Sequence, residues 1–445
     1  MEEFIKTLTE QMRCVKARSG VARELADHIT DQAEAYEHAG MKYEDALERA
    51  VHEMGDPVEI GVSMDRIHKP QADWKMMLLT FVLSIAGMFC MIPVYGSEIV
   101  PKQLLILLAA FVVVMAVYFI DYSILGRVGV AAYLVLTVFL WTSRHFYFPT
   151  INGRVPAMAV LVYLYVPVFA GILYQLRMRG YRSVLMAIAV IGITIFLALY
   201  FSSTMTTVLN MFLIMIVMTG AAAAKGMFGR QKKGMTALTV AVGILPLVYV
   251  LVAACSNVNS FRMHRIMAFL NWSQYQNEEG YLYKVIHEIL NHTKFVGGGS
   301  MEFLEQYPID SGMASEMMPL VIVYLYGVIA GILMTGLVVL FLLRAFLIVH
   351  AQKNQLGFLV SMSCSLVIFL NCAEGILVSF AMLPLTTTTL PFLTRGASTA
   401  LVYAVLIGLL LSVHRYEKVF AAERFGSLRE PKWKLRVRVE RRSES

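Results

Sequence analysis

The sequence predicts an all-α, polytopic membrane protein with ten transmembrane helices. Of its 445 residues, 58% are hydrophobic and 16% are charged, and the mean hydropathy is +0.64. Such a composition excludes a soluble globular domain of this length. The apolar residues also gather in ten runs, most of about 17 to 25 residues, and a helix of that length crosses about 30 Å of hydrocarbon.

The first 72 residues predict a small helical domain, which we call the prefix. It is polar and amphipathic and has no signal-peptide pattern, so we expect it in the cytosol. Gly and Ser positions predict four helices, with Ser19 as an N-cap: 2–17, 20–39, 43–54 and 57–67. Residues 24–61 resemble the small helical domain often prefixed to bacterial permeases, which implies a regulatory or partner-binding role.

The membrane domain is predicted over residues 73–415. Its helices are expected at 75–95, 103–121, 127–143, 156–176, 182–201, 204–225, 234–255, 317–346, 354–382 and 397–414. Lys and Arg gather in alternate loops, which by the positive-inside rule places both termini in the cytoplasm. The segment 256–316 between helices 7 and 8 then forms a large extracytoplasmic loop.

Neither the cysteines nor the basic tail predicts a cofactor. The five cysteines are scattered, so we expect no disulfide framework and no metal site. The tail, residues 416–445, either binds anionic lipid headgroups or is an ordinary cytoplasmic anchor. Membrane lipids are therefore expected partners, and nucleic acid is not.

The segment 383–396 breaks the helical pattern between the last two membrane helices. It contains two prolines and four consecutive threonines, which do not continue a transmembrane helix. Irregular backbone at membrane depth is tolerated only where it lies within the protein or lines a water-filled cavity. The small residues Gly396, Ala397 and Ser398 follow and permit close approach of a helix or ligand. A polar cleft near the outer face is the expected result.

The same segment carries a family resemblance. The order P-x-T-x-x-x-L-P-F-x-T-x-G-A-S, from Pro384 to Ser398, is similar to the signature of the SEDS family (shape, elongation, division and sporulation), typified by RodA and FtsW. Residues 265–286 resemble a second family segment through matches that include Arg265 and Tyr281. The sequence departs at Trp272, where the family has proline, and at 202–207, where it has a Gln-Pro-Asp-type sequence.

The resemblance implies a ten-helix fold in a bacterial plasma membrane and a specific reaction. SEDS proteins are peptidoglycan glycosyltransferases that polymerise lipid II beside a class B penicillin-binding transpeptidase. The reaction needs a base for the acceptor hydroxyl and positive charge for the leaving pyrophosphate. A divalent cation, Mg²⁺ or Mn²⁺, is compatible with that chemistry, but no residue pattern names its ligands.

Two carboxylates before helix 8 are candidates for the base. The family's essential aspartate lies eleven residues before a glycine, and counting back from Gly327 gives Glu316. Asp310 is the second candidate, although its place beside Pro308 also suits a turn. A plain structural alternative for Glu316 is a cap at the positive end of helix 8.

Five further residues are predicted to bind substrate. Arg265 and Lys284 are candidates for the pyrophosphate, Tyr281 and Ser398 match family motifs, and Arg395 lies within the polar break. Glu374 is an unusual charge inside helix 9, for which Arg395 is a candidate partner.

Two other functions compete with polymerisation. A flippase or transporter of a lipid-linked precursor needs a polar cavity but no base. A non-catalytic scaffold in a division or sporulation complex needs neither, and the departures from the family motifs favour it over the transporter.

Overall fold

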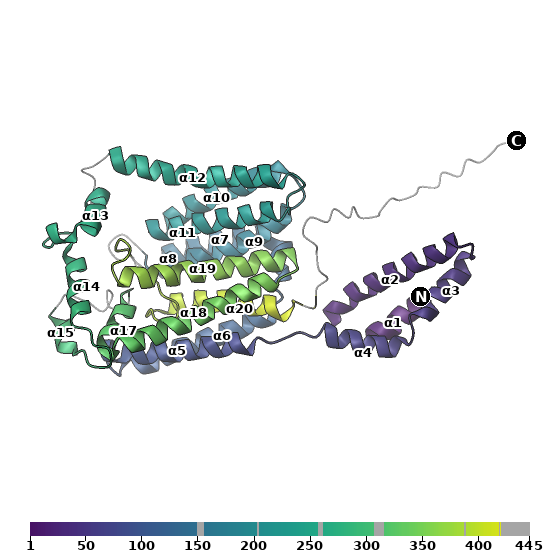
Figure 1. The fold of residues 1–445 in the computed structure, drawn as a ribbon, viewed down its shortest axis with the longest axis horizontal. Helices are drawn as coiled ribbons and strands as arrows, with labels where there is room; N and C mark the ends of the chain where they lie inside the picture. The colour runs from purple at the N-terminus through teal and green to yellow at the C-terminus, as the bar shows by residue number, and fades with distance from the viewer. Residues whose placement is uncertain are drawn as a thin grey trace.

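The fold is taken from a computed structural model of the chain. The structure describes residues 1–148, 155–202, 204–256, 261–306, 316–386, 389–417 and 419, without the side chains of 16, 246–256, 261, 262 and 305. Every regular element in these ranges is a helix, and the helices of the membrane domain lie roughly parallel in one bundle (Figure 1). The prediction of an all-α fold is confirmed.

The prefix forms four helices beyond one end of the bundle (Figure 1). They are α1 (Glu2–Glu10), α2 (Val15–His38), α3 (Tyr43–Glu53) and α4 (Pro57–Ile67). Helix α1 packs on α4 and helix α2 packs on α3. Small side chains such as Ala33, Ala46 and Ala50 are fully buried and allow α2 and α3 to lie close together.

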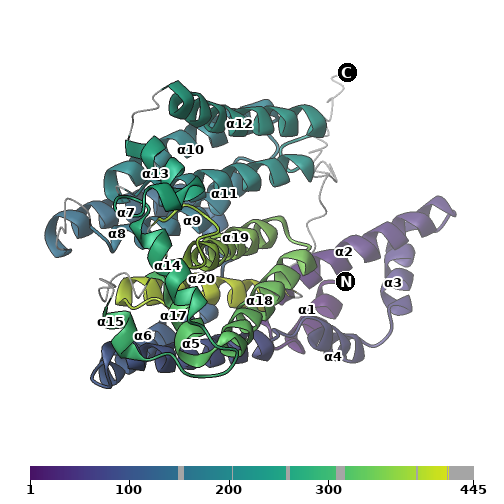
Figure 2. The same cartoon turned by 60° about the vertical axis from the view of Figure 1, so that its left-hand side comes forward.

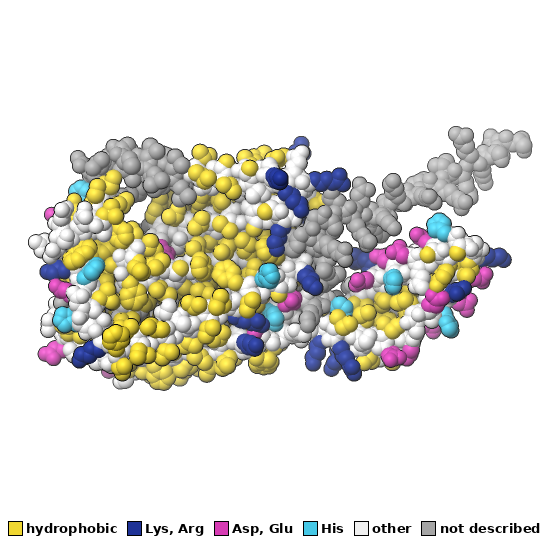
Figure 3. All heavy atoms as spheres, in the orientation of Figure 1, with side chains coloured by type: hydrophobic (Ala, Val, Ile, Leu, Met, Phe, Trp, Pro, Cys, Tyr) yellow, Lys and Arg dark blue, Asp and Glu magenta, His cyan; other side chains and the backbone are white. Residues whose placement is uncertain are grey.

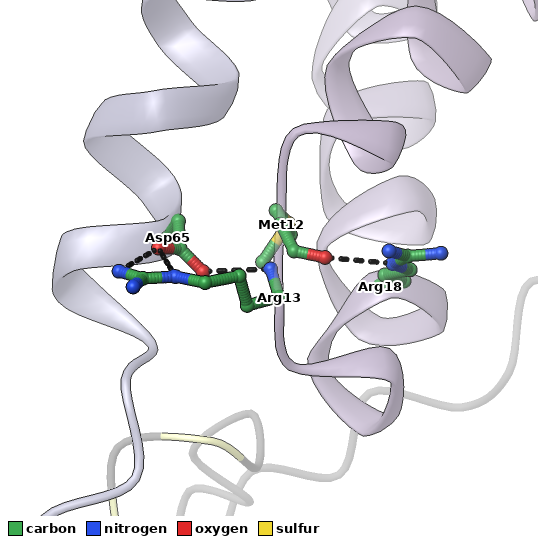
Figure 4. A network of polar contacts seen from close by, with 4 residues as sticks. All are labelled: Met12, Arg13, Arg18 and Asp65. Atoms are coloured by element: carbon green, nitrogen blue, oxygen red, sulfur yellow. Dashed lines mark hydrogen bonds and ion pairs between the residues drawn. The ribbon is translucent and has the colours of Figure 1, made fainter.

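The predicted boundary between the first two prefix helices is wrong. Ser19 lies inside α2, and the chain breaks at residues 11–14 instead. The Asp65 carboxylate fixes this break, because it accepts hydrogen bonds from the Arg13 backbone N–H at 2.8 Å and from the Arg13 guanidinium at 2.7 Å. Arg18 Nε also donates to the carbonyl of Met12 at 2.8 Å (Figure 4). Asp65 lies 52 residues after Arg13 in the sequence, so local capping rules do not predict its contacts.

Nine helices among the described residues are long and apolar enough to cross a membrane. They are α5 (Trp74–Tyr95), α6 (Ile99–Phe119), α7 with η1 (Ser123–Tyr147), α8 with η2 and α9 (Met158–Gln175), α10 (Tyr181–Ser202), α11 (Met205–Ala224), α18 (Val328–Ala351), α19 (Gln355–Ser379) and α20 (Ala397–Arg415). Helix α12 (Lys232–Ser256) coincides with the remaining predicted stretch. The count of ten transmembrane helices therefore stays a prediction. The nine described helices establish that the chain is a multi-pass membrane protein.

The surface of the bundle agrees with a membrane setting. A broad hydrophobic face covers the helices, and Lys and Arg side chains gather at the end next to the prefix (Figure 3). That end carries the loops predicted to be cytoplasmic. Asp73 fixes the start of α5 at this end: it accepts the Met76 N–H at 3.1 Å as the cap of α5, and it pairs with Arg344 Nε of α18 at 2.8 Å.

The loop between α12 and α17 lies across the opposite end of the bundle (Figures 1 and 2). It contains α13 (Phe261–Leu270), η3 (Trp272–Gln274), α14 (Tyr281–Asn291) and α15 (Met301–Glu305). Predicted helix 8 is not continuous, because α17 (Met318–Tyr326) ends at Gly327 and α18 begins after it. Gly327 has φ +95°, and a Cβ there would meet the Phe295 carbonyl at 2.7 Å. The glycine-rich stretch 295–300 therefore packs into this break.

Candidate functional site

The segment 383–396, which we call the re-entrant segment, is irregular as predicted over its described residues. It runs between α19 and α20, and Phe392 within it has a φ of +70°. Two glycines allow it to approach the bundle closely. A Cβ at Gly87 of α5 would lie 2.2 Å from the Phe392 carbonyl oxygen, and one at Gly375 of α19 would lie 2.3 Å from Leu390 Cδ1. Leu390 is 1% exposed, so the segment is inserted into the protein rather than laid on its surface.

A cavity of about 200 Å³, which we call the polar cavity, lies beside this segment. Its lining residues with polar side chains come from six parts of the chain: Tyr163, Ser202, Thr204, Thr206, Thr207, Glu316, Asn371, Glu374 and Thr389. Two carboxylates thus face one small space. The polar cleft predicted from the break in the helical pattern is present. Among the described threonines of the run 386–389, Thr389 lines it.

Glu316 lines the polar cavity. It lies one residue before Met317, the N-cap of α17, whose own side chain makes no capping hydrogen bond. Glu316 is partly buried, and a run of buried residues begins directly after it at Met317. The capping alternative for Glu316 therefore stays a hypothesis beside the catalytic one. Asp310, the other predicted base, lies outside the described residues.

Hydrogen bonds fix the other polar residues of the cavity that lie on α19 and in the re-entrant segment. Asn210 Nδ2 of α11 donates to Glu374 Oε2 at 2.8 Å and approaches the Tyr163 hydroxyl at 3.4 Å. Thr389 donates to the Asn371 amide oxygen at 3.3 Å. The predicted pairing of Glu374 with Arg395 is wrong, since the guanidinium carbon of Arg395 lies over the Tyr95 ring at 4.9 Å from its centroid.

The five predicted binding residues lie outside the described lining of the polar cavity. Arg265 is exposed on α13, and Lys284 of α14 lies 4.0 Å from Glu288. Tyr281 is partly buried at the start of α14. Arg395 is exposed within the re-entrant segment, and Ser398 lies in the first turn of α20. Their roles stay predictions.

The loop helices nevertheless contact the re-entrant segment. The Tyr283 hydroxyl of α14 accepts a hydrogen bond from the Leu385 N–H at 2.9 Å. Burial raises the pKa of the Tyr283 hydroxyl, and the positive charge of Arg265 opposes that shift. Arg265 is therefore close enough to act electrostatically on the residue that holds the start of the segment.

Two apolar spaces flank the same segment. The first, which we call the apolar groove, has a volume of about 330 Å³ and lies between α5, α6 and α20, with Phe392, Thr394 and Tyr403 in its lining. The second, about 580 Å³, lies between α14, α17, α18 and α19, with Leu390 and Leu393 in its lining. The Tyr403 hydroxyl donates to the Thr389 carbonyl at 3.1 Å, so one hydrogen bond links the apolar groove to the polar cavity.

Sequence reasoning missed most of the cavity wall. Asn210 and Asn371 are amides inside apolar spans, which is a usable signal for a functional interior. The stretch 202–207 departs from the family motif, and four of its residues line the cavity. Its hydroxyl groups replace the charged and amide side chains that the resemblance led us to expect there.

The fold and site define a membrane-embedded protein with a polar cavity beside apolar grooves, and comparison with known proteins identifies its class. A family model described as "Cell cycle protein" (FtsW, RodA and SpoVE) matches residues 157–419, which is more than half of the chain. The chain therefore belongs to the FtsW/RodA/SpoVE family of cell cycle proteins. No curated protein matches it.

Solved structures share the fold at low sequence identity. One is a chain from a study of the structural coordination of polymerization and crosslinking by a peptidoglycan synthase complex, with a TM-score of 0.60, 17% identity, and coverage of 78% of this chain and 99% of that one. Two others are Thermus thermophilus RodA, a rod shape determining protein, and a mutant of it. Both have a TM-score of 0.50 and 14% identity and cover 78% of this chain, with 97% of RodA and 98% of the mutant covered.

Proposed function

We propose that this protein is a glycosyltransferase of cell-wall synthesis that polymerises a lipid-linked disaccharide, lipid II. The observation that carries the proposal is the position of Glu316 at the polar cavity, next to the re-entrant segment. Family membership supports a role in peptidoglycan synthesis. The combination of a carboxylate, a polar cavity and an adjoining apolar groove suits a substrate with a sugar head and a polyprenyl tail.

In this proposal Glu316 is the general base. Its carboxylate takes the proton of the acceptor sugar hydroxyl as that oxygen attacks the anomeric carbon of the donor. The bond from the anomeric carbon to the pyrophosphate oxygen breaks, and the pyrophosphate leaves on its polyprenyl carrier. Positive side chains outside the cavity, with Arg265 and Arg395 as candidates, stabilise that anion.

The apolar groove between α5, α6 and α20 is the proposed place for a polyprenyl tail. Its lining is mostly apolar, and its outer helices α5 and α6 are among the least buried of the described membrane helices. A tail there lies against Phe392 and Thr394, while the sugar lies across the segment against Thr389. A class B transpeptidase is the proposed partner, since one structural match comes from a peptidoglycan synthase complex.

The test is polymerisation of fluorescent lipid II by purified protein, with and without a class B transpeptidase. Glu316→Gln keeps the size of the side chain but removes the base, and loss of a general base costs about 10²-fold to 10⁴-fold in rate. The matched control is Glu278→Gln, an exposed carboxylate of the extracytoplasmic loop that lies outside the cavity. Polymer formation that survives Glu316→Gln would refute the assignment of the base. Absence of polymer from the wild type, together with lipid movement across vesicles, would support a transporter instead.

A further inference from the structure

A second acidic residue, Glu374 of α19, lines the polar cavity. The mechanism proposed above, with Glu316 as the base, gives Glu374 no role. A charged side chain inside a membrane bundle is costly and usually has a function. Its Oε2 atom is held by Asn210 at 2.8 Å, and Asn210 comes from α11, far away in the sequence. Glu374 is thus oriented by a dedicated partner at the wall of a cavity.

The chemistry of the cavity selects among the parts of a lipid-linked sugar. Among its described lining residues, the charged side chains are Glu316 and Glu374, and the other polar groups are hydroxyls and amides. Two carboxylates repel a pyrophosphate, whereas they accept strong hydrogen bonds from neutral hydroxyl groups. The cavity is therefore suited to a sugar and unsuited to the anionic linkage.

The size of the cavity points the same way. A volume of about 200 Å³ is several times the share of about 30 Å³ that one water takes in the liquid. It is also smaller than the pockets of about 300 to 1,000 Å³ that hold drug-sized ligands. A single sugar ring suits such a space, and the rest of a lipid-linked molecule has to lie outside it.

We propose that the polar cavity is a subsite for a neutral, hydroxyl-bearing sugar ring, and that Glu374 binds this ring by accepting hydrogen bonds from its hydroxyl groups. The inference rests on the proposed function and deepens it. Glu316 and Glu374, which line the same cavity, then have different tasks: Glu316 receives the proton of the reacting hydroxyl, and Glu374 holds the ring in place. Asn210 is a positioning residue that acts through Glu374.

Binding without turnover tests the proposal in protein reconstituted in nanodiscs. All variants carry Glu316→Gln, and two probes are compared: lipid II and the polyprenyl pyrophosphate that lacks the sugar. Adding Glu374→Gln should weaken binding of lipid II about tenfold, the typical effect of one charge-assisted hydrogen bond. Binding of the sugar-free lipid should stay within about twofold. Ser365→Ala is the matched control, because Ser365 is a buried polar residue of α19 outside the described lining of the cavity.

Two further variants keep the result interpretable. Asn210→Ala leaves the carboxylate but removes its donor, so it should weaken lipid II binding less than Glu374→Gln. Glu374→Asp keeps a charge and should retain part of the selectivity if Glu374→Gln does not fold. Equal weakening for both probes, or no weakening for lipid II, would overturn the sugar subsite. The proposed function fails separately, when the wild type forms no polymer even though lipid II binding depends on Glu374.

Discussion

The sharpest test of the site is a single methyl group added at Gly87. A Cβ on this residue of α5 would lie 2.2 Å from the Phe392 carbonyl oxygen, whereas an ordinary contact begins at 3.4 Å. The obstacle is backbone, so a side-chain rotation cannot relieve it. Gly87→Ala therefore forces the re-entrant segment to retreat by about 1 Å, and a displacement of that size near a reacting centre can cost about 10²-fold in rate.

The same change should lower stability, because overpacking typically costs about 1–3 kcal/mol. The assays are lipid II polymerisation and the thermal unfolding midpoint in detergent. Gly336→Ala and Gly192→Ala are matched controls, since both glycines lie in membrane helices with no atom within 4 Å of an added Cβ. We expect these controls to match the wild type. A Gly87→Ala protein with full activity and an unchanged midpoint would show that the segment does not depend on this contact.

Three further predictions concern the ends of the bundle and the prefix. Hydrogen bonds from Arg13 hold the pKa of the Asp65 carboxyl below its usual value of 3.8. The stability that this pair gives the prefix is therefore present above about pH 4 and falls as pH drops through the folded pKa. Asp65→Asn should flatten that decline, as measured by hydrogen-exchange protection of α1 and α4 in the full chain. Asp73→Ala removes both the cap of α5 and the partner of Arg344, so it should cost more stability than Asp73→Asn. The cap alone should contribute about 1 kcal/mol to the loss, measured from unfolding midpoints. Equal losses for the two variants would contradict the role of Asp73 as both cap and ion-pair partner. Gly327→Ala adds a Cβ at φ +95° against the backbone of residues 295–297. It should destabilise the protein by about 1–3 kcal/mol and reduce the rate of polymerisation. An unchanged unfolding midpoint and an unchanged rate would refute the packing at this break.

The sequence predicts the membrane helices well, because each apolar run is a local property of the chain. Hydropathy located α5 and α19 to within a few residues at their starts, and two prolines with a threonine run located the irregular segment between α19 and α20. Local chemistry determined both of these features. Glu316 instead came from the spacing that the family resemblance implies, counted back from Gly327, and it lines the polar cavity.

Partners that come from distant helices could not be predicted in the same way. Asn210 and Glu374 are 164 residues apart, and nothing in either local pattern indicates the contact. Arg395 was the expected partner of Glu374 because opposite charges attract, but Arg395 is exposed and lies over Tyr95. The described partner of Glu374 is a neutral amide, Asn210, which donates one hydrogen bond to Oε2 and brings no second charge into the bundle.

The re-entrant segment is held from two helices, and that arrangement leads to a prediction about their combination. Gly87 of α5 allows Phe392 to approach, and Gly375 of α19 allows Leu390 to approach. A single methyl group at either glycine is relieved when the segment shifts toward the other helix. Gly87→Ala with Gly375→Ala blocks both shifts at once, so the stability loss of the double variant should exceed the sum of the single losses by about 0.5–3 kcal/mol. Losses that add to within about 0.5 kcal/mol, from unfolding midpoints converted to free energies, would mean that the two contacts act on independent parts of the segment. Thr389 and Phe392 would then move separately, and the polar cavity and the apolar groove would not share one structural element.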